Sequence, residues 1–394
     1  MKPLQDLVVL DLTRVLAGPY AGMMLADMGA DVIKVEARGH GDDSRAFGPY
    51  VNGESCYFMS LNRGKKSITL DLKKPEGKEI IKNLVKKADI LLENFRGGTM
   101  KKLGLDYDVL KEINPRLIYV ATTGFGLTGP YAHDPAYDVI VQGMGGLMSI
   151  TGQEGGEPTR VGASVGDITA GLFSVIGLLT ALHAREKTGK GQLVDVGMLD
   201  CQVAILENAI SRYLNADILP QPIGNRHPSI TPFESFKSKD GYVIIAVGND
   251  NLWAKFCELI GKPEWVEKEE YKSNSSRTAN QPALKADLTP IFAEKTTKEW
   301  IIELKAIGVP VGPINTVADV IEDPSIQARD MIVTVDHPVA GPIQMPGLPI
   351  KLSDTPGEVN IPAPVLGADN DEILSTMLGM SADEIAELKE KEVI

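Results

Sequence analysis

The sequence predicts an α/β fold in which a mainly parallel sheet is covered by helices. Apolar runs of strand length alternate with helix-like segments through residues 1–200. Helical crossovers are the usual connection between parallel neighbours, so this alternation favours a parallel sheet. The strand-like runs are 7–12, 31–36, 67–72, 90–92, 117–120 and 192–196.

Helix-like segments lie between these runs. The first, 20–28, is followed by Gly29, which suits a helix end, and the second, 75–87, opens at Pro75. A long apolar segment, 167–185, is typical of one buried helix that ends before Gly189. A further helix is predicted over 199–214.

The composition of the chain changes near residue 215. Residues 219–228 are rich in Pro and Gly and indicate a linker. The pair Asp240-Gly241 supplies the positive φ of a tight turn and predicts a hairpin over 234–247. The chain is Pro-rich again from Val317. A smaller α+β unit is therefore expected, with helices at 251–260, 282–294 and 298–307, before a terminal helix at 381–389.

The composition excludes several classes of protein. Of the 394 residues, 43% are hydrophobic and 24% are charged, as in soluble globular enzymes. The net charge of −13 repels nucleic acid phosphates and anionic membrane surfaces. The longest uncharged stretch, 168–182, is shorter than the roughly 20 residues that span a bilayer. We therefore expect no nucleic acid or membrane partner, and a buried core helix in this stretch.

Cysteine and histidine usage indicates the compartment and the metal content. The three cysteines form no CxxC pair, which suits a reducing cytoplasm. The N-terminus lacks the apolar core of a secretory signal. The five histidines form no HExxH motif and no Cys/His cluster. We predict a cytoplasmic protein without a metal site.

Two polar segments follow predicted strands, where open α/β sheets bind ligands. Residues 13–22 lack the GxGxxG pattern, so a nucleotide-type ligand and an ordinary turn both stay open. Residues 93–98 combine polar, aromatic and Gly residues at a strand end. Basic residues near the first loop either hold phosphates or form a solvated face: Arg38, Arg45, Arg63, Lys65, Lys66 and Lys73.

Asp167, at the start of the long apolar helix, has two interpretations. Asp is a favoured N-cap, because its oxygen satisfies unpaired N–H groups of the first turn. The positive helix end also favours an ionised carboxylate, and the small neighbours Gly166 and Ala170 leave room for a bulky electrophile. His227 is either an acid/base or an ordinary loop histidine.

A series of segments in order along the chain forms one specific pattern. It includes Gly-Ala-Asp-Val-Ile-Lys-Val-Glu at 29–36 and Gly-Asn-Arg-His-Pro at 224–228. The other segments are 10–12 with 17–19, 70–77, 89–96, 124–131, 166–171 and 188–192, continuing through 310–313 to 366–367. This series resembles the class III CoA-transferases, the family of formyl-CoA transferase and carnitine CoA-transferase.

The resemblance implies a fold and a mechanism. Family members have a large Rossmann-like domain with a mainly parallel sheet, made from both chain ends, a smaller α+β domain, and two interlocked subunits. Residues 1–215 and 330–394 would form the large domain, and 216–329 the small one. Asp167 would attack an acyl-CoA to give an aspartyl anhydride and then an aspartyl-CoA thioester. The spacing of Gly166 and Gly171 suggests N–H groups near the developing oxyanion.

The resemblance also implies how coenzyme A is held as a substrate, with no tightly bound cofactor. Arg38 and Lys102 would meet phosphates, and apolar residues would flank the adenine and the pantetheine arm. Tyr137, Gly166 and His227 would lie near the acyl group and a small carboxylic acid. The expected coenzyme A contacts are Val15, Leu16, Ala17, Arg38, Leu70, Lys73, Asn94, Phe95 and Lys102.

Two departures and three alternatives qualify this interpretation. Leu16 replaces the glutamine of formyl-CoA transferase, and 224–236 contains no glycine-rich run, so the carnitine-type branch fits better. An α-methylacyl-CoA racemase shares the aspartate but needs a histidine where this chain has Tyr137. A nicotinamide-dependent dehydrogenase would need the missing glycine pattern. A non-catalytic CoA-binding protein is the remaining alternative.

Overall fold

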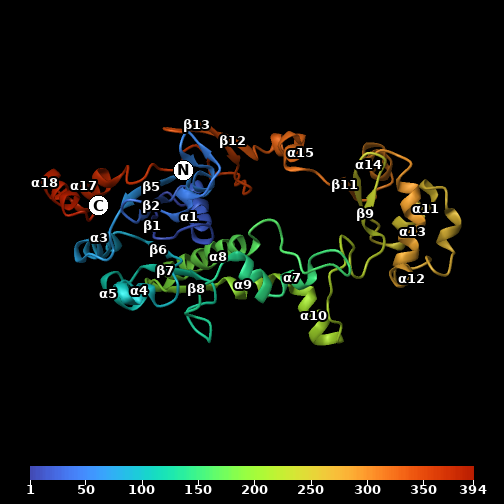
Figure 1. The fold of residues 1–394 in the computed structure, drawn as a ribbon, viewed down its shortest axis with the longest axis horizontal. Helices are drawn as coiled ribbons and strands as arrows, with labels where there is room; N and C mark the ends of the chain where they lie inside the picture. Colours follow the sequence, from blue (N-terminus) through green and yellow to red (C-terminus); the bar gives the residue numbers. More distant parts are fainter. The chain divides into compact units, whose positions relative to one another are not determined.

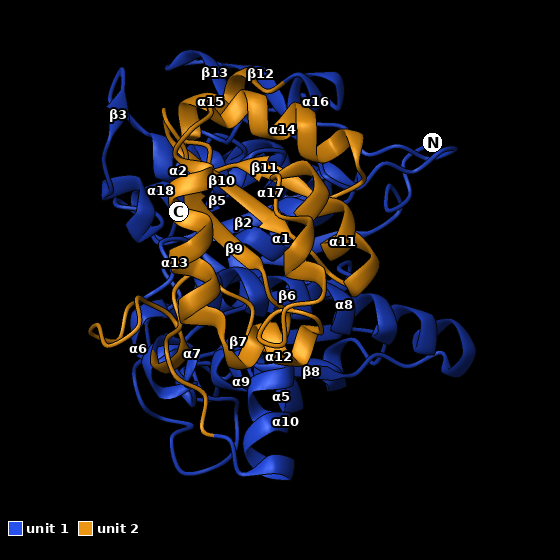
Figure 2. Ribbon diagram, turned by 90° about the vertical axis from the view of Figure 1, so that its right-hand side faces the viewer, with its two compact units in different colours: residues 1–148, 160–218, 324–394 blue, residues 149–159, 219–323 orange.

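The computed structural model describes all 394 residues and divides into two compact units (Figure 2). The large unit contains residues 1–148, 160–218 and 324–394, and the small unit contains 149–159 and 219–323. The units therefore change over at 218 and 323, within a few residues of the expected 215 and 329. Segment 149–159 joins the small unit, where the Gly224 N–H donates to the Gly152 carbonyl at 2.9 Å. This local sequence carries no periodicity that would have indicated it.

The large unit is built on a six-stranded sheet whose strands are all parallel. The strand order β5-β2-β1-β6-β7-β8 is that of a doubly wound nucleotide-binding fold, with its reversal between β1 and β6. The predicted parallel sheet is confirmed. Its strands are β1 Val8–Asp11, β2 Asp31–Glu36, β5 Lys65–Thr69, β6 Ile90–Glu93, β7 Ile118–Thr123 and β8 Leu193–Gly197.

Both faces of this sheet are covered by helices (Figure 1). Leu10 points into a core shared with α3 (Pro75–Val85), α5 (Tyr107–Ile113), α17 (Asn370–Leu378) and α18 (Ala382–Glu390). Val9 points the other way, toward α1 (Ala17–Asp27) and α8 (Val165–Thr188). Alternate residues of a strand face opposite sides, so an uninterrupted apolar run suits a sheet buried on both faces.

The C-terminal segment contributes to this core but not to the sheet. Ile373 and Leu388 are buried in the same cluster as Leu10. Every strand of the large sheet lies between residues 8 and 197, so the C-terminal segment belongs to the large unit through this core and not through the sheet. The C-terminal strands pair only with each other, as β12 (Ile332–His337) with β13 (Gly341–Pro346).

The helix predicted over 199–214 is two helices that meet at Leu206. Apart from these two helices, α9 and α10, the apolar pattern did not mark the remaining short elements of the chain up to residue 328. Among them, α7 crosses the boundary between the units. The elements are η1 Asp43–Ala46, β3 Tyr50–Val51, β4 Glu54–Ser55, α2 Cys56–Asn62, α4 Thr99–Leu103, α6 Asp138–Met144, α7 Leu147–Ile150, α9 Met198–Ile205, α10 Glu207–Ala216 and α16 Pro324–Ala328.

The small unit packs helices on a three-stranded antiparallel sheet of order β11-β10-β9. The predicted hairpin is confirmed, since β9 and β10 pair around the Asp240-Gly241 turn. Its core is aromatic, with the Phe236 ring stacked 4.4 Å from Phe292 and buried Trp253 and Trp300 nearby. The elements are β9 Phe233–Lys237, β10 Tyr242–Ala246, α11 Asp250–Leu259, η2 Pro263–Val266, α12 Asn274–Ala279, α13 Gln281–Phe292, α14 Thr297–Ala306, β11 Val311–Pro313 and α15 Val317–Glu322.

Helix α8 is longer and more exposed than predicted. It runs for 24 residues and is the one helix in the structure that is long and apolar enough to cross a membrane, by length and composition alone. Leu178 and Ala181 pack against the sheet, but Leu172, Phe173, Ile176 and Leu179 are exposed. The expected buried core helix is therefore buried on the face that packs on the sheet and exposed on the other.

Candidate active site

A cavity of about 550 Å³ opens at the carboxyl ends of β1, β2, β5 and β6, and we call it the strand-end cavity. It lies where a doubly wound sheet reverses its strand order, the usual ligand site of such sheets. Arg38, Leu70, Lys73 and Phe95, four of the residues expected to bind coenzyme A, line it. The structure therefore brings together two cations and two apolar side chains from three different loops.

A second cavity of about 720 Å³ contains Asp167, and we call it the nucleophile cavity. Tyr57, Tyr137, Asp138 and Arg160 line it together with Asp167. The two cavities share His40, Asp42 and Asp43 as lining residues. They are therefore neighbours along one face of the large unit.

The Asp167 carboxylate is free of hydrogen bonds and ion pairs. It lies in the first turn of α8, whose N-cap is Ser164, so the N-cap interpretation of Asp167 was wrong. Burial, followed by the negative charge of Asp138, raises the pKa of Asp167 to about 7. A half-buried, unpaired carboxylate of raised pKa in a cavity is typical of a reactive group.

Asp138, which was not among the candidate residues, holds the N-terminus of α8 by hydrogen bonds. Its Oδ1 accepts the Gly166 N–H at 2.8 Å, and its Oδ2 accepts from Gln142 Nε2 at 2.8 Å. The Gly166 N–H is thereby occupied, and Gly171 lies in the helix interior where its N–H belongs to the helical ladder. The suggestion that these two N–H groups meet an oxyanion was therefore wrong. The only sequence signal for Asp138 was its position next to Tyr137.

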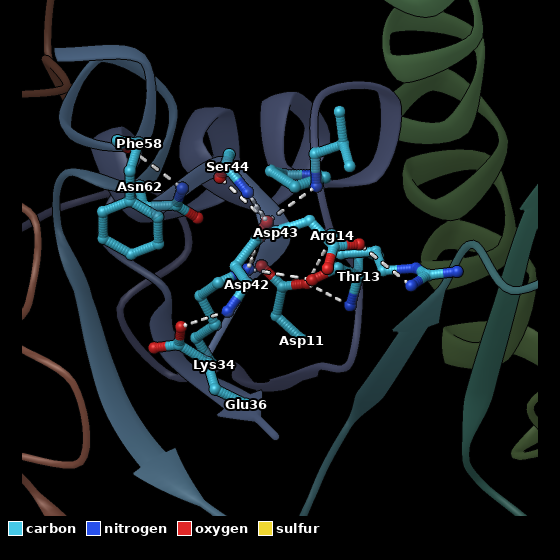
Figure 3. Close-up of polar contacts among 12 residues, drawn as sticks. Asp11, Thr13, Arg14, Lys34, Glu36, Asp42, Asp43, Ser44, Phe58 and Asn62 are labelled. Atoms are coloured by element: carbon cyan, nitrogen blue, oxygen red, sulfur yellow. Dashed lines mark hydrogen bonds and ion pairs between the residues drawn. The ribbon is translucent and has the colours of Figure 1, made fainter. Parts of the chain in front are cut away.

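The loop between β1 and α1 is held by a buried ion pair (Figure 3). Lys34 Nζ lies 2.8 Å from Asp42 Oδ2 and donates to the Thr13 carbonyl, also at 2.8 Å, and both charged side chains are essentially inaccessible. Asp42 Oδ1 accepts the N–H of Val15 at 3.0 Å. Burial opposes ionisation of Asp42, but the Lys34 charge and hydrogen bonds from Ser44 and Val15 lower its pKa to about 2.

This ion pair fixes a strained backbone. Val15 has a φ of 67°, a left-handed conformation that costs a β-branched residue about 1–3 kcal/mol. The Asp42 hydrogen bond to Val15 offsets part of this cost. Val15 and Asp42 both line the nucleophile cavity, and Thr13 and Asp42 line the strand-end cavity. The Lys34–Asp42 pair therefore sets the shape of the wall between the two cavities.

Asn94 clamps the same loop from the neighbouring strand. Its Oδ1 accepts the Arg14 N–H at 2.9 Å, and its Nδ2 donates to the Arg14 carbonyl at 2.8 Å. Phe95 is set in turn by Glu93, whose buried carboxylate accepts the Phe95 N–H at 2.8 Å. Burial raises the pKa of Glu93 to about 7. Asn94 thus positions the first loop and does not line either cavity.

Five of the six basic residues considered for phosphate binding have carboxylate partners. Arg45 binds Glu36 at 2.7 Å, Arg63 binds Asp27 at 2.7 Å, and Lys65 binds Asp11 at 2.7 Å, all in the interior. Lys66 lies 3.3 Å from Asp31. Arg38 lies 3.3 Å from Glu392, in a pair whose side chains are both exposed. A buried charge needs a partner, and neither a solvated face nor a phosphate site describes the first three.

The remaining predicted residues are placed as follows. Leu16 and Ala17 are buried at the start of α1 and line neither cavity. Lys102, on α4, also lines neither, although Thr99 and Leu103 of the same helix line the strand-end cavity. His227 belongs to the small unit, where its Nδ1 accepts the Ser229 N–H at 3.0 Å and its ring packs on Phe233.

Tyr137 is 72% exposed in the nucleophile cavity. Tyr57, Asp138 and Arg160 are lining residues that the sequence analysis missed. Arg160 carried no local signal, because it lies in a polar loop without periodicity. The structure contains no group of three or more His, Cys, Asp or Glu side chains that could hold a metal ion.

Comparison with known proteins identifies the family. The pattern of CoA-transferase family III matches residues 4–370. The chain is 45% identical over 359 residues to acetyl-CoA:oxalate CoA-transferase of Acetobacter aceti, covering 90% of this chain and 91% of that protein. It is 40% identical to succinyl-CoA:glutarate CoA-transferase of Mus musculus, covering 96% of this chain and 87% of that one.

A solved structure agrees with these sequence matches. The crystal structure of a CAIB/BAIF family protein from Brucella suis superposes with a TM-score of 0.85 at 43% identity, covering 95% of this chain and 99% of that chain. The resemblance inferred from the motifs is confirmed, and the chain belongs to CoA-transferase family III.

Proposed function

We propose that this CoA-transferase moves coenzyme A from an acyl-CoA donor to a small free carboxylic acid through covalent intermediates on Asp167. The observation that carries the proposal is the unpaired Asp167 carboxylate in a cavity that shares a wall with the strand-end cavity. The strand-end cavity would take the nucleotide end of coenzyme A, whose phosphates suit Arg38 and Lys73. The thioester arm would then reach Asp167 past the shared wall.

The reaction divides into four balanced acyl transfers. The Asp167 carboxylate attacks the donor thioester, giving a mixed anhydride and CoA thiolate. The thiolate attacks the aspartyl carbonyl, which releases the donor acid and forms an aspartyl-CoA thioester. The acceptor carboxylate attacks that thioester, giving a second anhydride and thiolate. The thiolate attacks the acceptor's carbonyl, which releases the new acyl-CoA and the free Asp167 carboxylate without net proton transfer.

Several properties of the substrates and the assembly belong to the same proposal. The acceptors named for the two relatives, oxalate and glutarate, are both small dicarboxylic acids. We propose an interlocked homodimer, supported by the exposed apolar face of α8, because exposed apolar side chains gathered on one face are typical of an interface. The three cysteines are free, which suits the proposed cytoplasmic location.

One observation keeps a second function in consideration. His40 lines the nucleophile cavity with Asp167, so a carboxylate and an imidazole face the same space, as an acyl-CoA racemase requires. Deuterium incorporation at the α-carbon of an acyl-CoA, without any acceptor acid, would favour this alternative.

The transferase proposal is tested with a panel of acyl-CoA donors and free acids, with mass spectrometry of the thioesters formed. Wild-type protein is expected to exchange coenzyme A, and Asp167→Asn to lose exchange while it still binds coenzyme A and melts cooperatively. Asp43→Asn, a second carboxylate of the same cavity, is the matched control and should retain exchange. Undiminished exchange in Asp167→Asn would overturn the assignment.

A further inference from the structure

The nucleophile cavity contains more negative than positive side chains. Asp42, Asp43, Asp138 and Asp167 all line it, and Arg160 is the only lysine or arginine that does. Asp42 is paired with buried Lys34 and Asp43 with Arg14, which leaves Asp138 and Asp167 as the carboxylates without a lysine or arginine at hydrogen-bond distance. These two carboxylates repel a substrate that keeps a negative charge, unless a cation lies where that charge is placed. The position of Arg160 and its unpaired N–H groups therefore decide which acyl groups the cavity accepts.

The backbone next to Arg160 and the backbone next to Asp167 are both hydrogen-bonded to the buried pair Gln142–Asp138. Gln142, which is fully buried, accepts the Val161 N–H on its Oε1 at 2.9 Å. Its Nε2 donates to Asp138 Oδ2 at 2.8 Å, and Asp138 Oδ1 accepts the Gly166 N–H at 2.8 Å. Three hydrogen bonds thus connect the residue after Arg160 with the residue before Asp167, so the two backbone segments are held in a fixed relation.

The guanidinium of Arg160 is only partly used. Its Nε donates to the Val161 carbonyl at 3.2 Å and its Nη2 to the Gly162 carbonyl at 3.2 Å. The nearest carboxylate oxygen, Asp138 Oδ2, is 3.8 Å away and makes no hydrogen bond to it. Nη1 has no partner, and the side chain is 47% exposed. The Nη1 end of the guanidinium is therefore available to a ligand carboxylate.

We propose that Arg160 binds the distal carboxylate of a dicarboxylic acyl group whose proximal carbonyl reacts at Asp167. The inference rests on the proposed transferase function and deepens it by naming the substrate class. In a monocarboxylic substrate the single charge is consumed when the anhydride or thioester forms. A dicarboxylic substrate retains one charge in this cavity, and Arg160 is the lining cation that offsets it.

The test measures exchange between an acyl-CoA and its own labelled free acid, and compares dicarboxylic with monocarboxylic acyl groups of the same length. Succinyl-CoA is mixed with isotopically labelled succinate, and butyryl-CoA with labelled butyrate; glutaryl and valeryl form a second pair. Each pair differs mainly by a carboxylate in place of a methyl group, and no other acceptor is needed. Arg160→Gln, Arg160→Lys and the matched control Arg329→Gln are compared; Arg329 is exposed and lines neither cavity.

Arg160→Gln is expected to lower kcat/KM for the dicarboxylic exchanges by about 10- to 100-fold, and to change the monocarboxylic exchanges by less than about threefold. Arg160→Lys should recover part of the loss, and Arg329→Gln should behave as wild type. An equal fall for both substrate classes, no fall for either, or a wild-type preference for the monocarboxylic pairs would each overturn the role of Arg160. Absence of all exchange in wild type would instead overturn the transferase proposal itself.

Discussion

The pH dependence of the reaction should be set by Asp167 and moved by its neighbour Asp138. Burial and the Asp138 charge raise the pKa of Asp167 from 3.8 to about 7. Only the ionised carboxylate is nucleophilic, so kcat/KM should fall about tenfold per pH unit below pH 7. Asp138→Asn removes the negative charge and should move this acid limb to lower pH. Asn retains an Oδ1 acceptor for the Gly166 N–H.

The size of the shift follows from the order of the two causes. Burial is the larger cause, so Asp138 accounts for less than half of the rise from 3.8 to about 7. A decrease in the Asp167 pKa of about one unit would raise its ionised fraction at pH 6 from about a tenth to about a half. Relative to the plateau at pH 8, kcat/KM at pH 6 should therefore increase about fivefold in Asp138→Asn.

The assay is identity exchange between an acyl-CoA and its labelled free acid, measured from pH 5 to pH 8. Titration of the substrates and of Glu93 is common to all variants, so the difference between profiles isolates Asp167. Asp43→Asn is the control, because Asp43 lines the same cavity but does not contribute to the raised pKa of Asp167. An unshifted limb in a normally melting Asp138→Asn, or a wild-type profile flat across this range, would refute the reasoning.

Three further predictions concern stability and binding. Asp167→Asn should raise Tm at pH 8 and leave it unchanged at pH 4, because a carboxyl whose folded pKa lies above 3.8 costs stability as pH rises toward 7; an equal Tm change at both values would contradict this. Lys34→Met should lower the free energy of unfolding in urea by about 3–5 kcal/mol, because it leaves the Asp42 carboxylate buried without its cation; a change below about 1 kcal/mol would contradict it. Lys73→Ala should raise KM for acyl-CoA about tenfold, whereas Lys102→Ala, which removes a cation outside the cavity, should not; equal effects in the two variants would show that the strand-end cavity does not bind the phosphates.

Strands β1, β6 and β7 could be predicted because burial on both faces of the sheet leaves short runs of mostly apolar residues in the sequence. Residues 31–36 form β2 with the predicted bounds, and the Asp240-Gly241 turn identified the hairpin of the small unit. The two-helix break at Leu206 was not predictable, because the apolar pattern continues through it.

Side-chain partners at the site could not be predicted, because they come from residues far apart in the chain. Arg45 looked like a phosphate ligand until the fold placed it on Glu36. The sequence also identified Asp167. Only the structure shows that Ser164 takes the N-cap position, which leaves the Asp167 carboxylate unpaired. Asp138 and Arg160 enter the site through Gln142, a contact that no local pattern encodes.

Transfer of heavy oxygen from substrate to enzyme tests most directly that Asp167 carries the acyl group. The protein is incubated with an acyl-CoA and the corresponding free acid, labelled with ¹⁸O in both carboxylate oxygens. The mass of the peptide containing Asp167 is then measured by mass spectrometry. Attack by the labelled acid on the aspartyl thioester, followed by collapse of the anhydride, leaves a heavy oxygen in the Asp167 side chain. We expect that peptide alone to gain ¹⁸O during exchange; coenzyme A exchange with no label in it would contradict the account.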